Sequence, residues 1–282
     1  MMSQSLDRGL LYGDGFFTTL LVEAGQLANW PAHWRRLQLS AQRLKFPPLS
    51  QSEVLAAVRA QLKAEAFDSK RSLIKILITR GEGGVGYQPL AQPQPRIRVQ
   101  SLPFPQGAIK NDQAWSLFTV KMTLSAVRVS QQPILAGLKH CNRLENVLAR
   151  EALLATHFDE AIMLGQQGEV ICATQANLIL LKGNQLITPQ LSESGVLGTC
   201  LSSLPKALTF NAAGDSAKSQ WQWQIRPVAL DELAQADEIL CCNAVRGVMP
   251  VTQFQNRDYQ TQKGTQIAQA WLKWQSQNLF QL

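Results

Sequence analysis

The sequence lacks the features of a disulfide-stabilised, zinc-binding or membrane protein. Its 282 residues include only five cysteines, with no Cys-x-x-Cys pair and no histidine at a zinc-ligand spacing except the adjacent His140. We therefore expect reduced, mostly buried thiols and no metal site. The apolar stretch at residues 16–22 is too short to cross a bilayer, and no leader-like pattern opens the chain. These absences predict a cytoplasmic protein without a membrane partner.

Clusters of basic residues are also missing, although the net charge is +7. The 27 lysines and arginines are scattered along the chain, and no motif combines aromatic with basic residues, so we expect no nucleic-acid partner. A small anionic ligand fits this charge better. The chain has no internal repeat, and its 45% hydrophobic residues suffice for the cores of one large or two ordinary domains.

Apolar periodicity predicts an α/β chain with two domains. The proline-rich segment 103–108 is typical of a linker, which gives a small N-terminal α/β domain at residues 1–102 and a larger C-terminal domain at residues 109–282. In the second domain, short strands joined by short turns predict an antiparallel sheet. The main expected elements are helices at 31–44, from Ser50 onward and at 261–275, and strands at 73–79, 97–102, 115–122, 160–164, 169–172, 177–181, 186–188 and 238–242.

Three glycines in residues 80–87 match the G-x-G-x-x-G pattern of dinucleotide-binding proteins. Gly81, Gly83 and Gly86 follow a predicted strand, as that pattern requires. However, the third glycine must begin a helix, and the proline-rich residues 88–95 cannot form one. We therefore predict a loop here and no dinucleotide site.

A lysine lies just ahead of a short predicted helix in the segment 136–150, which reads AGLKHCNRLENVLAR. Lys139 lies upstream of the apolar stripe of this helix. A lysine at the end of an element can lose contact with water, which disfavours its charged form and makes it a usable amine nucleophile for an aldehyde. The stripe itself has helical spacing and is expected to pack against the protein; it comprises Leu144, Val147, Leu148 and Ala152.

The sequence of this lysine segment resembles the Gly-x-Lys-His-x-Asn-Arg-Leu-Glu segment of aminodeoxychorismate lyases. These are fold-type IV pyridoxal-phosphate enzymes, related to branched-chain and D-amino-acid aminotransferases. Residues 12–19 (YGDGFFTT) and the His-x-x-Arg-Leu run at 33–37 are similar to further segments of the family. The resemblance implies an α/β (α+β) fold of the D-amino-acid aminotransferase type, with pyridoxal 5'-phosphate at the domain interface, and a homodimer. It also implies the elimination of pyruvate from anionic aminodeoxychorismate to give 4-aminobenzoate for folate biosynthesis.

The same resemblance assigns roles to individual residues. Lys139 would bind the aldehyde of the cofactor and then act as the catalytic base, and Arg36 would bind the cofactor phosphate. Backbone N–H groups of Thr199 and Cys200, at the start of a predicted helix, would complete the phosphate site. The remaining expected cofactor-binding residues are Cys172, Asn177, Asn243 and Ala244.

Two positions depart from the family pattern. Cys172 stands where fold-type IV enzymes have a glutamate that keeps the pyridine nitrogen protonated, and a neutral thiol cannot do this. A transaminase must store charge in the ring, whereas formation of an aromatic product drives the lyase elimination, so this departure favours the lyase. Val85 stands where lyases often have an arginine, which leaves open how a substrate carboxylate is held. The alternatives are a branched-chain or D-amino-acid aminotransferase and a cofactor-binding relative without activity.

Overall fold

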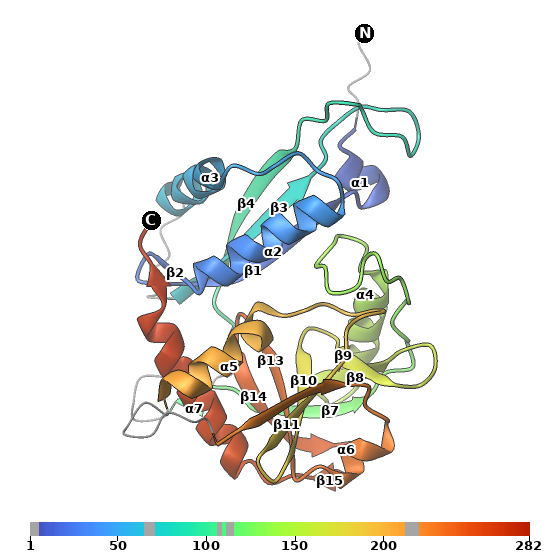
Figure 1. The fold of residues 1–282 in the computed structure, drawn as a ribbon, viewed down its shortest axis with the longest axis vertical. Coiled ribbons are helices and arrows are strands. Elements are labelled where there is room, and N and C mark those ends of the chain that lie inside the picture. The colour runs from blue at the N-terminus through green and yellow to red at the C-terminus, as the bar shows by residue number, and fades with distance from the viewer. Residues whose placement is uncertain (1–5, 65–70, 106–108, 111–115, 212–219) are drawn as a thin grey trace. The chain divides into compact units, whose positions relative to one another are not determined.

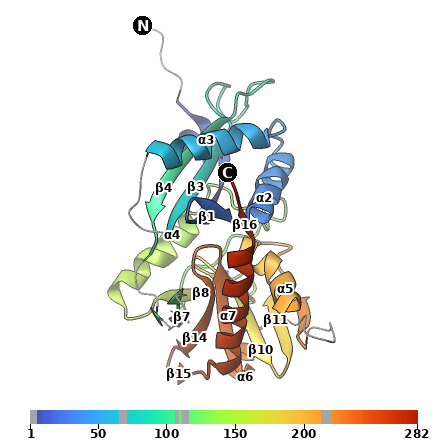
Figure 2. The ribbon, with the colours of Figure 1, turned by 90° about the vertical axis from the view of Figure 1, so that its left-hand side faces the viewer.

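The structure is a computed structural model that describes residues 6–64, 71–105, 109–110, 116–211 and 220–282. The chain divides into two compact units, drawn in Figures 1 and 2. The first unit comprises Met1–Phe104, Leu138–Arg143 and Leu279–Leu282, and the second comprises Pro105–Gly137 and Leu144–Asn278. The units differ from the predicted continuous domains because residues 138–143 and 279–282 both form backbone hydrogen bonds or bridges with strands of the first unit. Within the predicted linker 103–108, residues 106–108 lie outside the described residues.

The first unit is built on a five-stranded antiparallel sheet in the order β16-β2-β1-β3-β4. Helices α2 and α3 cover one face of this sheet (Figure 2), and the short helix α1 precedes the first strand (Figure 1). The elements are α1 (Arg8–Tyr12), β1 (Gly15–Glu23), β2 (Gln26–Ala28), α2 (Trp30–Arg43), α3 (Gln51–Ala64), β3 (Arg71–Thr79), β4 (Arg96–Pro103) and β16 (Leu279–Phe280). These bounds confirm the predicted helices and strands of this part of the chain.

The side chains of strand β1 alternate between a buried face and a half-buried face of the sheet, because successive side chains of a strand project from opposite faces. Phe16 and Leu20 are fully buried and join the core formed with α2 and α3. Phe17 and Thr19 are only half-buried and lie on the other face. Thr19 pairs with Lys75 of β3, so this second face of the sheet carries a charged side chain.

The second unit contains a mixed nine-stranded sheet. Its main path runs β12-β11-β10-β13-β14-β7-β8-β9, and β15 pairs with β14. The predicted hairpins are present, since β8 pairs with β9 and β10 with β11 in antiparallel fashion. The strands are β7 (Val120–Leu124), β8 (Glu160–Leu164), β9 (Val170–Ala173), β10 (Asn177–Lys182), β11 (Gln185–Pro189), β12 (Gln222–Arg226), β13 (Glu238–Asn243), β14 (Gly247–Phe254) and β15 (Arg257–Asp258), with a separate pair β5 (Ile109–Lys110) and β6 (Ser116–Leu117).

The antiparallel pairing predicted for strands joined by short turns is confirmed for β8 with β9 and β10 with β11, but it does not extend through the whole sheet. Strand β7 pairs in parallel with both β8 and β14, and β11 pairs in parallel with β12. Short turns fix the hairpins locally, whereas parallel neighbours are joined by long connections that leave no local signal. The strand predicted at 115–122 is divided between β6 (Ser116–Leu117) and the start of β7 at Val120, and residues 111–115 lie outside the described part of the chain.

Among the described residues, five helical segments accompany the second sheet. They are α4 (Leu144–Glu151), the 3-10 helix η1 (Ala152–Ala155), α5 (Thr199–Asn211), α6 (Asp231–Gln235) and α7 (Gln262–Gln277). Helices α5 and α7 pack in one core with β13 and β14, and α7 buries Ile267 and Trp271 as predicted. No helix among the described residues has the length and apolar character needed to cross a bilayer.

Helix α4 does not pack as its sequence predicts. Leu144, Val147 and Leu148 are 76%, 58% and 56% exposed, and only Ala149 of this helix is buried. The expectation that this stripe packs within the chain was therefore wrong. Periodicity identifies an apolar face, but it does not say what covers that face. Leu154 of the following 3-10 helix η1 is also exposed, at 85%.

Candidate active site

Lys139 lies in an extended segment that adds to the edge of strand β1. Phe17 N–H donates to the carbonyl oxygen of Lys139 at 2.9 Å, and Cys141 N–H donates to the carbonyl oxygen of Gly15 at 2.9 Å. Arg143 donates from Nη2 to the carbonyl oxygen of Leu138 at 2.6 Å, which closes the segment on itself. These bonds fix the backbone around Lys139 without a helix, as the sequence predicts.

The ring of Phe17 receives two ammonium groups. Lys139 Nζ lies 4.7 Å from the ring centroid, and Lys75 Nζ lies 4.9 Å from the same centroid. An aromatic face attracts a cation through its quadrupole. Contact with the ring of Phe17 therefore restricts the positions of both lysine ammonium groups. The sequence analysis missed Lys75. The available signal was a lysine inside an otherwise apolar strand, at a position that alternation places on the face of Phe17.

Arg36 projects from helix α2 toward the face of the sheet that α2 covers, opposite to the face of Phe17. Its Nη1 donates to Thr18 Oγ1 at 3.4 Å, and His33 Nδ1 lies 2.7 Å from the same hydroxyl oxygen. Burial lowers the pKa of Arg36 to about 10. Burial, and then the charge of Arg36, lower the pKa of His33 well below its usual value, so the imidazole is neutral. A guanidinium in a desolvated site is a strong binding group for an anion.

The hydroxyl of Thr18 links these two side chains. It accepts the hydrogen bond of Arg36 Nη1 and shares a second hydrogen bond with His33 Nδ1, whose direction depends on the tautomer of the ring. A neutral imidazole suits this buried site because it adds no second positive charge beside Arg36.

In the second unit, Asn177 uses both ends of its amide within the fold. Its Oδ1 accepts from Gly198 N–H at 2.8 Å, and its Nδ2 donates to the carbonyl oxygen of Val196 at 2.7 Å. A Cβ atom at Gly198 would lie 2.2 Å from Asn177 Oδ1, so only glycine permits this approach. Asn177 therefore shapes the loop that leads into helix α5.

Thr199 and Cys200 form the first turn of α5, and both are buried. The Cys200 thiol packs in an apolar core and forms a hydrogen bond with Cys242, and burial raises its pKa well above the usual value. The thiol therefore keeps its proton and is a poor nucleophile. What this turn can offer a ligand is its backbone, because the first N–H groups of a helix have no partner within the helix.

Asn243 and Ala244 lie where strand β13 turns into β14. Asn243 Oδ1 accepts from the N–H groups of Val245 and Arg246 at 3.0 and 2.8 Å, which is the pattern of a side chain that stabilises its own turn. Ala244 is half-buried in this turn. Like Asn177, Asn243 uses its side chain to fix the backbone conformation of its own turn.

Cys172 lies on strand β9 and is 7% exposed. It packs in an apolar cluster with Val129, Ala149, Met163 and Ile171. Glu169, the nearest carboxylate along the chain, lies before β9, and its Oε2 accepts from the N–H of Gln167. The described residues contain no group of three or more His, Cys, Asp or Glu side chains placed to hold a metal ion.

Comparison with known families places these features in context. The model of the family described as amino-transferase class IV matches residues 15–254, which include β1, α2, the lysine segment and the α5 turn. The chain belongs to this class IV family.

Relatives of this class IV chain include enzymes with named reactions. It is 36% identical over 247 residues to the aminodeoxychorismate lyase of Vibrio harveyi, covering 87% of this chain and 85% of the relative. The crystal structure of 4-amino-4-deoxychorismate lyase from Pseudomonas aeruginosa has 34% identity and a TM-score of 0.79, covering 97% of this chain and 94% of that chain. A hypothetical aminotransferase from Mycobacterium tuberculosis in its PLP-bound form has 18% identity and a TM-score of 0.77, covering 98% and 94%, and it supports the fold.

The fold of this class IV chain is thus the fold-type IV architecture that the resemblance predicts. Of the predicted site residues, Lys139 and Arg36 belong to the first unit, where they contact neighbouring residues of β1. The other predicted residues belong to the second unit, where Asn177 orders the α5 turn. Sequence reasoning missed Lys75, Thr18 and the partnership of His33 with Arg36, because strand registers are needed to see them.

Proposed function

We propose that this chain is a pyridoxal-phosphate-dependent 4-amino-4-deoxychorismate lyase, which eliminates pyruvate from its substrate and releases 4-aminobenzoate. The observation that carries the proposal is the pair of ammonium groups on Phe17, because the reaction needs one reactive amine and a fixed positive charge for a carboxylate-bearing substrate. The lyases of Vibrio harveyi and Pseudomonas aeruginosa, at 36% and 34% identity, support it.

The donor set of the chain fits pyridoxal phosphate. Lys139 supplies a primary amine for the aldehyde, and the desolvated guanidinium of Arg36 supplies a forked donor for the phosphate. Within the second unit, the first turn of α5 offers backbone N–H groups suited to an anion, presented by a loop whose Gly198 leaves no room for a Cβ atom. When bound, the cofactor supplies an aldehyde that captures the substrate amine and an electron sink for the bond that breaks.

The residues of the chain contribute binding and proton transfer. Lys139 Nζ, once exchanged for the substrate amine, takes the proton from C4 of the substrate as general base. The ring of Phe17 holds this amine at the edge of β1 and limits its side-chain freedom. Lys75 is placed to attract a substrate carboxylate, a role for which Val85 offers no charge.

The chemistry at Cys172 favours the lyase over the aminotransferase. The thiol lies in an apolar cluster and carries no charge that would keep a pyridine nitrogen protonated. An aminotransferase needs that charge because it must reprotonate its intermediate at a different carbon. Elimination from aminodeoxychorismate is driven by formation of an aromatic ring, and it therefore depends less on the missing carboxylate.

We also propose that the chain is a cytoplasmic homodimer. The apolar face of α4 and η1, formed by Leu144, Val147, Leu148 and Leu154, is the support for the dimer. Contiguous exposed apolar residues of this kind mark association surfaces. In size-exclusion chromatography with light scattering, Val147→Glu should shift the protein toward monomer, whereas Ile225→Glu, at an exposed apolar residue of β12, should not.

Turnover assays separate the proposed lyase from the alternatives. Purified protein is incubated with aminodeoxychorismate, and 4-aminobenzoate is followed without any added oxo acid. Product formation under these conditions supports the lyase. Amino transfer that depends on a 2-oxo acid would instead identify an aminotransferase, and neither reaction despite a bound yellow chromophore would identify an inactive cofactor-binding relative.

The covalent bond to the cofactor is tested directly by borohydride reduction. The reduced holoprotein should carry one pyridoxyl adduct, on the peptide that contains Lys139. An adduct on Lys75 would contradict the assignment, although both ammonium groups contact the same ring.

A further inference from the structure

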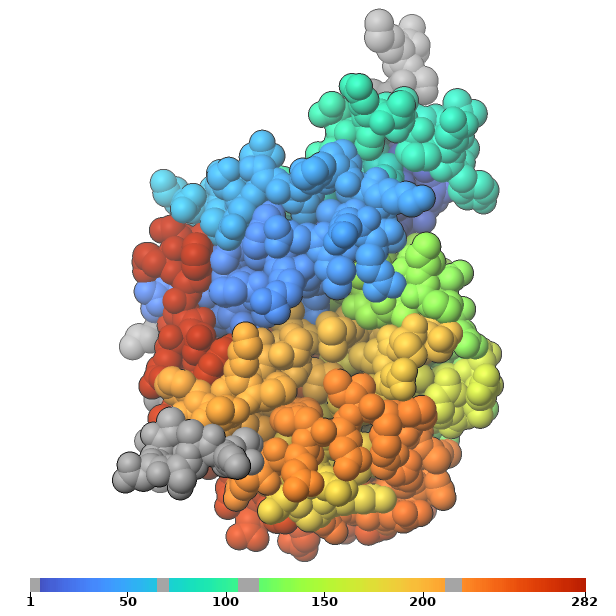
Figure 3. All heavy atoms as spheres, viewed as in Figure 1, coloured from blue at the N-terminus to red at the C-terminus, as the bar shows by residue number. Residues whose placement is uncertain are grey.

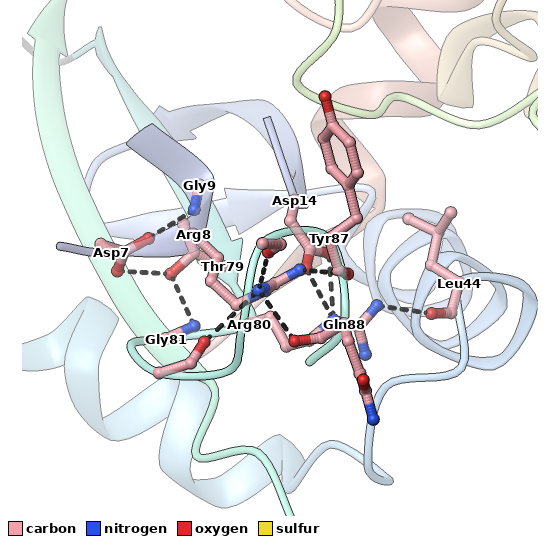
Figure 4. Close-up of polar contacts among 12 residues, drawn as sticks. Asp7, Arg8, Gly9, Asp14, Leu44, Thr79, Arg80, Gly81, Tyr87 and Gln88 are labelled. Atoms are coloured by element: carbon pink, nitrogen blue, oxygen red, sulfur yellow. Dashed lines mark hydrogen bonds and ion pairs between the residues drawn. The ribbon is translucent and has the colours of Figure 1, made fainter. Parts of the chain in front are cut away.

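The basic residues of the first unit differ in whether a carboxylate neutralises them. Arg8 and Arg80 share the carboxylate of Asp14, with Nε to Oδ2 distances of 2.9 and 2.8 Å (Figure 4). All three side chains are largely buried, and the other nitrogen atoms of the two arginines donate to backbone carbonyl oxygens. Both arginines are therefore occupied by contacts within the fold.

The strands of the first sheet carry more basic than acidic side chains. Glu23 is the one acidic residue in β1, β2, β3, β4 and β16, and its Oε1 lies 3.2 Å from Arg71 Nη2. Arg96 of β4 pairs with Glu82, which follows β3, and its Nη2 lies 2.6 Å from Oε1. Each of these two arginines thus has a carboxylate of its own.

Lys75 and Arg98 are the other two basic residues of these strands. No carboxylate among the described residues forms an ion pair with either side chain. Lys75 is half-buried and places its ammonium group 4.9 Å from the centroid of the Phe17 ring, whereas Arg98 is exposed. These two side chains therefore carry positive charge that the described part of the fold does not neutralise.

Strand register brings Arg98 into line with Phe17. Phe17 pairs with Leu77 of β3, and Leu77 pairs with Arg98 of β4. Directly paired residues of antiparallel strands share a face of the sheet, and neighbouring strands lie about 4.8 Å apart, so the backbone of Arg98 is roughly 10 Å from that of Phe17. Helices α2 and α3, drawn in blue in Figure 3, cover the opposite face, where Ile97 and Val99 pack against the core.

Lys75 lies on the same face, between these two positions. It is two residues from Leu77 on β3, which makes it a diagonal neighbour of Arg98, at a spacing of about 7–8 Å that long side chains can bridge. Its direct partners are Thr19 on β1 and Gln100 on β4. One area of this face therefore combines two cations with a hydroxyl and an amide, all groups that can donate hydrogen bonds to a carboxylate.

We propose that Arg98 binds the substrate carboxylate that is farther from the reacting amine, and that Lys75 binds the nearer one. This inference rests on the proposed function, because aminodeoxychorismate has one carboxylate on the ring, opposite the carbon that bears the amine, and another on the enolpyruvyl group beside that carbon. Lys75 contacts the same ring as Lys139, whereas Arg98 lies on the next strand, so the order of the two cations matches the order of the two carboxylates.

The two cations also define a class of substrate. A dicarboxylate can bind both, whereas an amino acid with a single carboxylate can bind only one, so this face favours the dianion. The planar guanidinium of Arg98 offers paired donors to a carboxylate at the end of a molecule. Arg98 thereby supplies, from β4, a positive charge that Val85 does not offer.

A matched pair of variants tests Arg98 by direct binding. Arg98→Gln removes the charge without a carboxylate partner, and Arg96→Gln removes the same charge on the same strand and face, where Glu82 already neutralises it. Isothermal titration calorimetry of the holoprotein measures the Kd for 4-aminobenzoate, which keeps only the ring carboxylate. We expect this Kd to rise about five- to tenfold in Arg98→Gln and to stay within about twofold in Arg96→Gln.

A second probe separates the two cations. Chorismate has both carboxylates and a hydroxyl in place of the amine, so its Kd should rise in Arg98→Gln and in Lys75→Ala alike. The Kd for 4-aminobenzoate should rise less in Lys75→Ala than in Arg98→Gln. Arg98→Lys should recover part of the lost affinity for both compounds, because it restores the charge without the planar fork.

Steady-state release of 4-aminobenzoate completes the test. Arg98→Gln should raise the KM for aminodeoxychorismate about fivefold with kcat within about twofold, because Arg98 binds the substrate without touching the reacting atoms. Arg96→Gln should leave both constants unchanged. Arg98 is exposed, so its substitution should not change the denaturant midpoint of unfolding.

Four results would overturn the inference. They are an unchanged Kd for 4-aminobenzoate in Arg98→Gln, an equal increase in Arg96→Gln, a larger increase in Lys75→Ala, and a wild-type protein that binds neither probe. If the wild-type protein binds both probes but releases no 4-aminobenzoate from aminodeoxychorismate, the proposed function fails instead. The calorimetric comparison then still decides whether Arg98 binds a carboxylate.

Discussion

The two units present their predicted site residues in opposite ways. In the first unit the functional groups belong to the side chains themselves, because Lys139 Nζ lies over the ring of Phe17 and Arg36 Nη1 donates to Thr18 Oγ1. In the second unit the side chains of Asn177 and Asn243 are occupied by hydrogen bonds to their own loops. A ligand at the second unit therefore meets backbone groups whose positions these asparagines set. A residue in a motif can act through its own atoms or through the backbone that it shapes.

The largest effect should come from the amine in the first unit. Lys139→Ala removes the general base and the covalent link, so kcat should fall about 10³-fold or more. Lys75→Ala is the matched comparison, because it removes the other ammonium group on Phe17. It should raise KM while retaining most of kcat, as measured by 4-aminobenzoate release. Equal losses of kcat in both variants would contradict the separate roles.

Arg36 should give the next largest effect, on cofactor affinity. Arg36→Ala removes charge-assisted hydrogen bonds to the phosphate, each worth about 1.5–3 kcal/mol, so the Kd for pyridoxal phosphate should rise about 10- to 100-fold. Absorbance titration of the apoprotein measures this change. Arg35→Ala is the control, because Arg35 is the exposed neighbour on the same helix and should leave Kd unchanged.

Cys172→Glu tests whether a cation of the cofactor lies opposite this position. The new carboxylate enters an apolar cluster, so we expect the cofactor-free protein to lose about 2–4 kcal/mol of unfolding free energy. Bound cofactor should restore part of this loss, because a protonated pyridine nitrogen would pair with the carboxylate. Any transaminase side activity should gain more than elimination does. The same loss of stability with and without cofactor would remove Cys172 from the site.

Asn177→Ala should act on the second unit through its backbone. It leaves Gly198 N–H and the Val196 carbonyl group without their partners, which should lower the free energy of unfolding by about 2 kcal/mol. The Kd for pyridoxal phosphate should also rise, because the first turn of α5 loses its support. Cys200→Ala, in the first turn of α5, should leave the Kd for pyridoxal phosphate unchanged, because only the backbone of Cys200 is assigned to the phosphate. A larger effect at Cys200 would contradict the backbone role.

The smallest effect concerns pH. Burial, followed by the charge of Arg143, lowers the pKa of His140 to about 4, so this imidazole is neutral in the folded protein at pH values where the unfolded chain binds a proton. Stability should therefore fall as the pH is lowered from about 6.5 toward 4. Denaturant unfolding of His140→Gln should show a shallower fall over this range. His157→Gln, at an exposed histidine, should retain the wild-type slope.

The sequence predicts local features of this fold well and distant ones poorly. Alternation and helical spacing predict β3, α2 and α7 correctly, because these patterns act over a few residues. The parallel pairing of β7 with β8 and β14 has no such signal. The exposed stripe of α4 was misread because spacing predicts an apolar face without naming its partner.

The residues of the candidate site likewise fall into those that the sequence predicts and those that it does not. Lys139 and Arg36 belong to short motifs, so the sequence alone points to them. Lys75 and the shared carboxylate of Asp14 emerge only from strand register and from a loop that returns to helix α1. No pattern of residue types in the sequence indicates that one aspartate joins Arg8 to Arg80.

The first unit is assembled from three separate stretches of chain, and this affects how it can be produced. Residues 279–280 form its edge strand β16, and residues 138–143 supply the segment with Lys139. A fragment that stops near residue 104 would leave β2 with an open edge, and open edges promote aggregation. During synthesis this sheet is completed only after residues 279–280 leave the ribosome. A tag inserted just after β16 would lie next to an edge strand of this sheet.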